Sequence, residues 1–336
     1  MKRLAFAAAV LTLSAQVFAG ANFIIINTDS AGVGFNDTTP VSPIGGNTGT
    51  TLGEQRLIAF QFAADLWGEV VDSDVTIRVS ASFEPLFCTS GSATLGSAGP
   101  STIHSDFSGA PLLSTWYPQA LANSLAGSDV SGQPDINASF NGDIDFNNSC
   151  LFNTNWYYGL DNNHPGNSIN FLNTVMHEIA HGLGFSGFTN LSNGSLQGGI
   201  PGVFARLTFD NDLGLHWDEM NNSQRASSAT NSGDLVWRGS NAMVIAFFFL
   251  SNGTDPSGFP LLYAPGNLEL GSSVYHWDTS VSPNALMEPN LSGNLDVTET
   301  LDLTPTMLRD MGWPIVDQDD DLTADIYDNC PDVFNL

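Results

Sequence analysis

The chain has 336 residues, of which 42% are hydrophobic and only 13% are charged, so it can bury a sizeable core and is not a charge-rich disordered chain. Its 35 acidic and 8 basic residues give a formal net charge of −27. This balance excludes a nucleic-acid-binding protein, which needs a basic surface, and disfavours adhesion to an anionic membrane. It suits a soluble secreted protein, including one that binds divalent cations.

The first 19 residues have the pattern of a secretory signal peptide. Lys2 and Arg3 precede an apolar stretch, Leu4 to Leu13, and small or compact residues stand at Val17 and Ala19. The apolar stretch is too short to span a bilayer. We therefore expect secretion to the extracellular or periplasmic space, with cleavage near Ala19 and no membrane anchor. The alternative interpretations are a buried N-terminal strand and an anchor helix.

Periodicity in the next part of the chain predicts a mixture of helices and strands. Apolar residues recur about every four positions from Gly53 to Val71, which predicts a helix. Val75 to Phe83 alternates apolar and polar residues and is predicted to be a half-buried strand. Residues 88–134 are rich in Ser, Gly and Pro, which predicts long loops with a short helix near Tyr117 to Leu125. A second short strand is predicted at Ile136 to Phe140.

The spacing of apolar residues from Ser168 to Leu183 predicts a second long helix. Asn167 or Ser168 can cap its beginning, and Gly184 ends it.

The remainder of the chain has weaker periodicity. A long segment rich in Asn, Ser and Gly contains one dense apolar run, Met243 to Leu250, which is too short for a membrane span and is predicted to be a buried element. A last helix is predicted from Thr304 to Met311, with Gly312 ending it. No internal repeat is apparent.

The three cysteines are Cys88, Cys150 and Cys330. In an exported chain the favoured bridge is Cys88–Cys150, because both residues lie in the N-terminal half. Cys330 is then unpaired or pairs outside this chain, and the sequence leaves the connectivity open.

The strongest functional signal is His177-Glu178-Ile179-Ala180-His181 on the second long helix. Two histidines four positions apart on a helix point the same way, so both imidazoles can reach one zinc ion. Glu178 lies beside them and is placed to take a proton from a zinc-bound water. The alternative is a pair of surface histidines on an amphipathic helix.

A catalytic zinc site needs a third protein ligand. The compact arrangement has a histidine six residues after the second one, where this chain has Gly187. We favour His276, and His216 is its rival, because spacing alone does not decide between them. Another class of zinc enzyme would use an acidic ligand, for which Glu219 is the candidate. Two other histidines are interpreted as polar loop residues: His104 and His164.

The motifs together resemble the leishmanolysin-like branch of the metzincin metalloproteases. The chain has His177-Glu178-x-x-His181-x-x-Gly184-Phe185, then His276 after a long gap, then Met287 and a closing helix that ends Arg309-Asp310-Met311-Gly312-Trp313. The likeness covers about residues 50–315, with strong motifs at 177–185 and 272–313.

The resemblance implies the α+β class with a metzincin-like zincin fold: a twisted mixed sheet with an active-site helix, then an irregular C-terminal subdomain with a Met-turn and a closing helix. It implies that His177, His181 and His276 bind zinc and that Glu178 is the general base. Gly184 would allow a sharp turn after the helix, and Met287 would form a hydrophobic floor beneath the metal.

The expected organisation is a signal peptide (1–19), a metalloprotease domain (20–315) and an acidic tail (316–336). Within the domain we expect an upper part (20–187) and an insertion with a lower part (188–315).

The expected function is a secreted zinc endopeptidase that acts on protein or peptide substrates. Such a site usually lies in a cleft under an edge strand that pairs with an extended substrate, and the order of elements nominates Ile136 to Phe140. The alternatives are a non-catalytic secreted binding or adhesion protein on the same scaffold, and a zinc hydrolase of a non-peptide amide. The presence of Glu178 favours an enzyme, because a binding role has no need for the base.

The tail carries a second motif, which reads DxDxDxxxDxxDNCP from Asp317 to Pro331. Carboxylates on alternate residues can wrap one hard cation such as calcium, and the spacing resembles a thrombospondin type 3 repeat. Leu322 stands where that repeat usually has a turning glycine, and a single copy suggests a shortened form of a longer protein. The implied calcium ligands are Asp317, Asp319, Asp321, Asp325 and Asp328; the alternative is a solvated acidic linker.

Overall fold

The computed structural model describes residues 20–145, 147–290 and 295–335, so the predicted signal peptide lies outside the described residues. The fold mixes helices with several small sheets, which confirms the α+β class.

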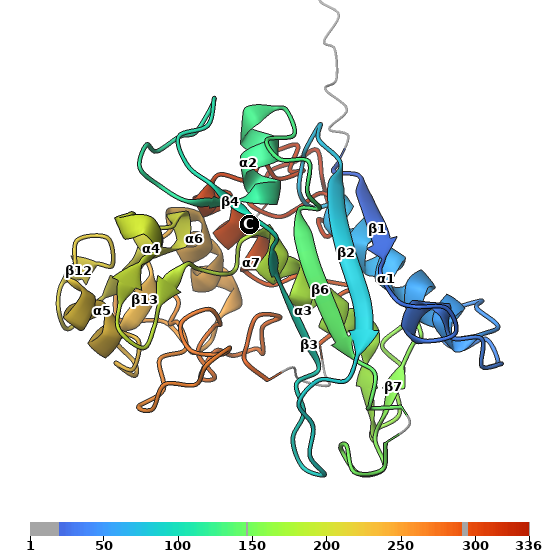
Figure 1. The fold of residues 1–336 in the computed structure, drawn as a ribbon. Coiled ribbons are helices and arrows are strands. Elements are labelled where there is room, and N and C mark those ends of the chain that lie inside the picture. The colour runs from blue at the N-terminus through green and yellow to red at the C-terminus, as the bar shows by residue number, and fades with distance from the viewer. Residues whose placement is uncertain (1–19, 146, 291–294, 336) are drawn as a thin grey trace, which may run out of the picture.

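The main sheet has four strands in the order β1-β2-β6-β3 (Figure 1). These strands are β1 (Phe23–Asn27), β2 (Ile77–Glu84), β6 (Ile136–Asn141) and β3 (Gly96–Pro100). The first three are parallel, and β3 runs antiparallel to β6 at one edge. Because side chains on a strand alternate between the two faces, the apolar residues of β2 all point to one face, where they are buried.

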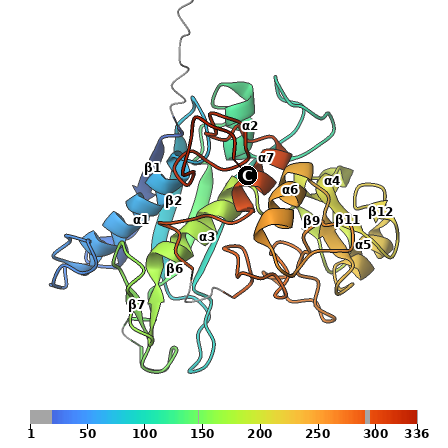
Figure 2. The same ribbon diagram turned by 180° about the vertical axis from the view of Figure 1, so that it is seen from behind.

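Two helices cover this apolar face (Figure 2), namely α1 (Leu52–Gly68) and α3 (Phe171–Leu183). The indole nitrogen of Trp67 in α1 donates a 3.0 Å hydrogen bond to the carbonyl of Met176 in α3. Gly182 permits the close packing of α3 on β6, because a Cβ at this position would lie 2.4 Å from the side chain of Ile136.

A cluster of phenylalanines fixes the beginning of α3 against the sheet. The ring of Phe171 lies 5.3 Å from that of Phe83 in β2 and 5.0 Å from that of Phe140 in β6, measured between centroids. These spacings are typical of favourable aromatic pairs. The helix that carries the histidine motif is therefore held at both ends, by Phe171 at its start and by the Gly182 contact near its end.

The other elements are short. They are η1 (Gly34–Asn36), β4 (Ile103–His104), β5 (Tyr117–Pro118), α2 (Gln119–Ala126), β7 (Asn155–Tyr157), β8 (Ser168–Asn170), β9 (Thr189–Asn190), β10 (Ser195–Leu196), η2 (Gln197–Gly199), α4 (Val203–Leu207), β11 (Thr208–Asp210), β12 (Leu215–His216), α5 (Asn222–Ser228), β13 (Leu235–Trp237), α6 (Ser240–Phe249) and α7 (Thr304–Met311). In both ribbon views α7 lies between the main sheet and the group formed by α4, α5 and α6 (Figures 1 and 2).

Some details of the predicted elements are wrong. The cap of α3 is Asn170, whose side chain accepts from the N–H of Asn173, and not Asn167 or Ser168. The reason is that residues 168–170 are extended and pair with β7. The edge strand β3 also lies in a segment predicted to be loop.

The apolar run Met243 to Leu250 largely forms helix α6, but it is not buried throughout. Within α6 only Ala242 and Ala246 are buried, and the rings of Phe247 and Phe248 are 76% and 59% exposed. The prediction of a buried element is therefore wrong for this face of the helix.

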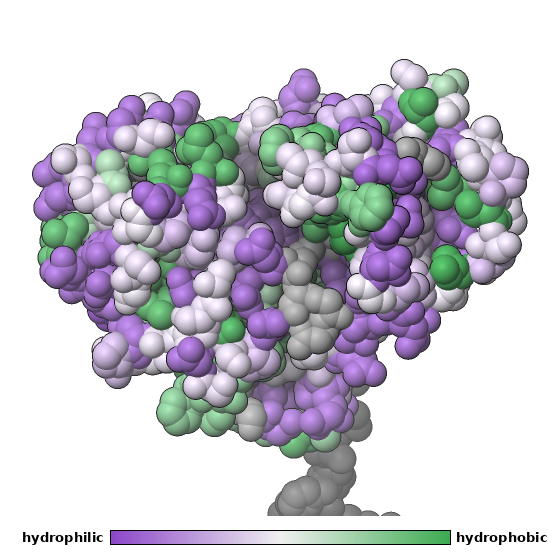
Figure 3. All heavy atoms as spheres, turned by 90° about the horizontal axis from the view of Figure 1, so that it is seen from below, coloured by the Kyte–Doolittle hydropathy of each residue, from purple (hydrophilic) through white to green (hydrophobic). Residues whose placement is uncertain are grey.

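Seen from below, hydrophilic residues cover much of the surface, and hydrophobic residues form small groups among them (Figure 3). In the described parts of the chain, no helix has both the length and the apolar character needed to cross a membrane.

The disulfide Cys88–Cys150 is present, and Cys330 is an exposed free thiol. The bridge closes a loop with a sequence separation of 62 residues and so restricts the unfolded chain.

We expect the double variant Cys88→Ser, Cys150→Ser to lower the free energy of unfolding in urea by about 2–5 kcal/mol. Cys330→Ser is the matched control and should change it by less than about 0.5 kcal/mol. Equal stability of the double variant and the wild type would contradict this expectation.

Candidate metal centre

Three histidines converge in the structure although one of them is distant in sequence. The Nε2 atom of His177 lies 3.1 Å from Nε2 of His181 and 3.3 Å from Nε2 of His276. The ring centroids are 4.8 to 5.2 Å apart. His177 and His276 are buried, and His181 is partly buried.

Each imidazole is oriented by a backbone carbonyl on its other nitrogen. The Nδ1 atoms of the three histidines donate to the carbonyls of Leu286 (2.7 Å), Phe185 (2.6 Å) and Ser272 (2.8 Å), for His177, His181 and His276 respectively. A carbonyl oxygen can only accept, so the proton of each neutral ring is on Nδ1 and its lone pair is on Nε2.

Three lone pairs therefore face one another in a space with little access to water. Burial lowers the pKa of His177 to about 3 and that of His181 to about 4, and the pKa of His276 lies well below its ordinary value for the same reason. At neutral pH the rings carry no extra proton that could bridge these nitrogens. A bound cation is the group that would satisfy all three lone pairs at once.

The spacing fits a tetrahedral zinc ion. Zinc–nitrogen bonds of about 2.0–2.1 Å at tetrahedral angles place two ligand nitrogens about 3.3–3.4 Å apart. The 3.1 and 3.3 Å separations agree with this value within a few tenths of an ångström. Nδ1–H donation to a carbonyl is also the usual way in which a zinc-binding histidine is held.

Gly184 produces the turn that holds His181. It ends α3 with a φ of 141°, outside the range that side chains other than glycine readily adopt. The chain then folds back, so that the carbonyl of Phe185 reaches Nδ1 of His181.

Gly187 occupies the position of the compact third ligand, and the structure gives a reason for a residue without a side chain. A Cβ on Gly187 would lie 2.3 Å from the ring of Tyr275. Tyr275 directly precedes His276, so this space is used to bring the distant histidine to the site. Val274, one residue earlier, is fully buried with a φ of 74°, a conformation that β-branched residues rarely adopt. Such backbone strain is common at functional sites.

Glu178 lies on α3 beside the edge strand β3. Burial raises the pKa of its carboxyl to about 8, and a backbone hydrogen bond from Ala98 partly offsets this effect. A Cβ on Gly96 would lie 2.9 Å from both Cγ and Oε1 of Glu178. Gly96 and Ala98 were not identified from the sequence, because nothing in residues 88–134 marks a strand there.

Met287 is fully buried. Its carbonyl accepts the N–H of Trp277, the residue after His276, at 2.8 Å, and the carbonyl of Leu286 holds His177. The segment around Met287 thus contacts His177 directly and the residue that follows His276. Its role as a hydrophobic floor stays a prediction.

The rival ligands lie in other surroundings. His216 belongs to β12, where its ring packs on Phe209 with centroids 4.9 Å apart, and its backbone N–H donates to the carboxylate of Glu219. His104 contacts the hydroxyl of Thr102 at 2.8 Å. The ring of His164 lies 6.4 Å from that of Tyr157.

The tail brings three of its five predicted ligands together, since carboxylate oxygens of Asp317, Asp319 and Asp321 lie within 4.8 Å of one another. Both oxygens of Asp319 lack a hydrogen-bond partner, and Leu322 has a φ of 77°, at the position where the repeat has glycine. The other two predicted ligands accept backbone hydrogen bonds: Asp325 and Asp328. Calcium binding stays a prediction.

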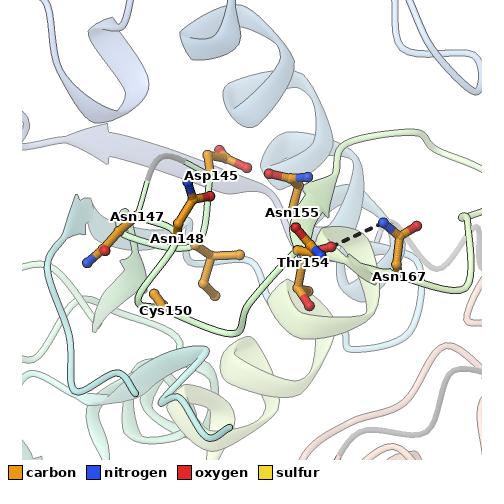
Figure 4. Close-up of a pocket in the computed structure, with 9 residues that line it drawn as sticks. Asp145, Asn147, Asn148, Cys150, Thr154, Asn155 and Asn167 are labelled. Carbon is orange, nitrogen blue, oxygen red and sulfur yellow. Dashed lines mark hydrogen bonds between the residues drawn. The ribbon is translucent and has the colours of Figure 1, made fainter. Parts of the chain in front are cut away.

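A cavity of about 340 Å³ lies elsewhere, beside the disulfide, and none of the three histidines lines it (Figure 4). Asparagines dominate its wall, and the side chain of Asn167 donates to the carbonyl of Asn153 across it. Asp145 contributes to the wall, and both its oxygens accept hydrogen bonds, from Arg56 and Tyr158 on one oxygen and from the N–H of Trp156 on the other.

Comparison with known proteins gives one similarity. A family model described as SPBPB7E8-like matches residues 51–199, which is less than half of the chain. The matched part contains His177, Glu178 and His181 but ends before His276. No curated protein and no solved structure matches the chain.

The geometry makes a direct prediction about metal content. His276→Ala removes one of three converging nitrogens and should reduce bound zinc to well below one equivalent after dialysis against a weak chelator. His216→Ala, which changes a histidine outside the group, should keep the wild-type content. Metal analysis of the purified proteins checks both, and zinc loss in His216→Ala with retention in His276→Ala would contradict the assignment.

Proposed function

We propose that this protein is a secreted zinc endopeptidase of the metzincin type, similar to the leishmanolysin-like branch. The observation that carries the proposal is the convergence of three imidazole lone pairs, two of them from the helix that also carries the buried carboxyl group of Glu178. The zincin fold, the secretion and the substrate class are parts of the same proposal.

The residues present divide the chemistry between them. His177, His181 and His276 would hold the metal through Nε2. A bound zinc ion supplies a Lewis acid that lowers the pKa of a coordinated water and polarises a carbonyl group. Glu178 would accept a proton from the attacking water and pass it to the leaving amine. Its raised pKa suits a group that holds a proton between these two steps, and a nearby cation would favour its ionised form.

The edge strand of the proposal is β3, which replaces the strand nominated from the sequence. Ile136 to Phe140 lies in β6, which pairs with β2 on one side and β3 on the other and so has no edge for a substrate. β3 is the edge strand and pairs with β6 on one side only. Its residues Gly96 and Ala98 lie against Glu178. An extended peptide that pairs with the other side of β3 would pass close to the carboxylate.

An enzyme accounts for Glu178 better than a binding protein does. A buried carboxyl group without a cationic side-chain partner is unfavourable, as the raised pKa shows, and metal binding alone does not need it. An available strand edge favours a peptide over a non-peptide amide, because main-chain pairing selects an extended peptide backbone.

Glu178→Gln keeps the side-chain volume and removes the proton acceptor. We expect hydrolysis of casein to fall by about 10²- to 10⁴-fold while the zinc content stays at the wild-type level. Zinc analysis and casein hydrolysis on the same samples separate loss of the base from loss of the metal. Hydrolysis unchanged by the substitution would contradict the enzyme proposal. Hydrolysis of non-peptide amides without hydrolysis of a peptide library would show that the substrate class is a different one.

Gly96→Ala tests the proximity of β3 and Glu178. The added Cβ would displace the carboxyl group, and a misplacement of about 1 Å can reduce turnover by up to about 100-fold. Gly99→Ala is the matched control, because a Cβ at Gly99, on the same strand, would have no atom within 4 Å. We expect a fall in kcat for Gly96→Ala only, at similar thermal stability. Equal kinetics of the two variants would show that β3 does not position the base.

A further inference from the structure

One of the carbonyls that orient the histidines belongs to a segment with its own polar anchor. The carbonyl of Leu286 accepts the Nδ1–H of His177 at 2.7 Å, and the backbone N–H of the same residue donates to the carboxylate of Asp302. Leu286 is therefore held on both sides, by a histidine and by a carboxylate.

Asp302 joins this segment to the closing helix. Its other oxygen accepts the backbone N–H of Thr304, the first residue of α7, at 2.7 Å, and also the hydroxyl group of Thr304. The carboxyl group thus links the beginning of α7 to the turn before Met287. A second carboxylate secures the same turn, since Glu288 accepts the N–H of Ala285 at 2.8 Å.

The burial of Asp302 needs a reason. The residue is 9% exposed, and desolvation raises the pKa of its carboxyl group, although the hydrogen bonds from Thr304 and Leu286 act in the opposite direction. A helix beginning can be capped by a neutral hydroxyl or amide side chain. Asp302 has a second oxygen, which accepts the N–H of Leu286, and capping the helix does not require this second bond.

We propose that Asp302 is a positioning residue for the metal centre, which fixes the peptide of Leu286 and thereby holds His177 with its Nε2 directed at the ion. Asp302 does not touch the metal or the substrate. Its effect passes through one backbone residue, and this inference rests on the proposed zinc site.

The chain offers a matched control on the same helix. Asp310 in α7 accepts three hydrogen bonds, from the indole of Trp237 (3.0 Å) and from the N–H groups of Asn241 (2.9 Å) and Ala242 (3.1 Å). These bonds join α7 to the end of β13 and to the beginning of α6, and none of them involves Leu286 or Asp302. Asp310→Asn therefore perturbs the anchoring of α7 without changing the support of His177.

The test compares Asp302→Asn with Asp310→Asn in the full chain. Asparagine keeps the volume but has one acceptor oxygen in place of two, so it cannot accept from both Leu286 and the backbone N–H of Thr304. Loss of a group that bonds a zinc ligand directly typically changes metal affinity by about 10- to 100-fold, and Asp302 holds such a group, the carbonyl of Leu286. We expect Asp302→Asn to release zinc to a chromophoric chelator at least tenfold more readily than Asp310→Asn at matched thermal stability, and to alter the visible spectrum of the cobalt-substituted protein.

Zinc release from Asp302→Asn at the rate of the wild type or of Asp310→Asn would overturn the inference. Failure of the wild type itself to bind zinc would instead overturn the proposed function. Should Asp302→Asn not fold, Thr304→Val removes the hydroxyl group that holds the carboxylate and leaves Leu286 intact. A several-fold faster release of zinc from Thr304→Val supports the inference, and an unchanged rate contradicts it.

Discussion

Three imidazole lone pairs that meet in a buried space form an arrangement that is unfavourable without a positive charge among them. The rings are held in this arrangement by backbone carbonyls, so the nitrogens cannot simply turn away from one another. These carbonyls come from three separate loops, at Phe185, Ser272 and Leu286. The geometry of the centre thus depends on the folded loops, because the helix alone supplies only two of the three imidazoles, those of His177 and His181.

The main sheet and its helices create the conditions for this convergence. Phe171 and Gly182 fix α3 on the sheet, which sets the positions of the two histidines that the helix carries. Beyond the helix, Gly187 leaves the space into which Tyr275 packs, and His276 follows Tyr275 in the chain. Small residues at these contacts allow backbone and rings to approach more closely than any larger side chain would permit.

Side-chain periodicity accounts for what could be predicted from the sequence. The helix with the histidine motif and the strands β2 and β6 repeat apolar residues with the period of their secondary structure. Residues 96–100 are Gly, Ser, Ala, Gly and Pro, which carry no such signal, and their strand is defined by pairing with β6. The cap at Asn170 depends on the pairing of β8 with β7. Tertiary structure also decides that His276, and not His216, lies beside His177 and His181. It likewise decides which backbone carbonyls accept from the Nδ1 atoms of the three histidines.

The distance along the chain between the second and third histidines has a consequence for assembly. His276 follows His181 by 95 positions (276 − 181), and the carbonyl that supports His177 comes later still, at Leu286. A nascent chain that has emerged only as far as the histidine helix therefore lacks the imidazole of His276 and the carbonyl of Leu286. The three imidazoles can meet only after the chain has been made as far as Leu286 and has folded back on the helix, so an ion held by all three could bind only at a late stage of folding.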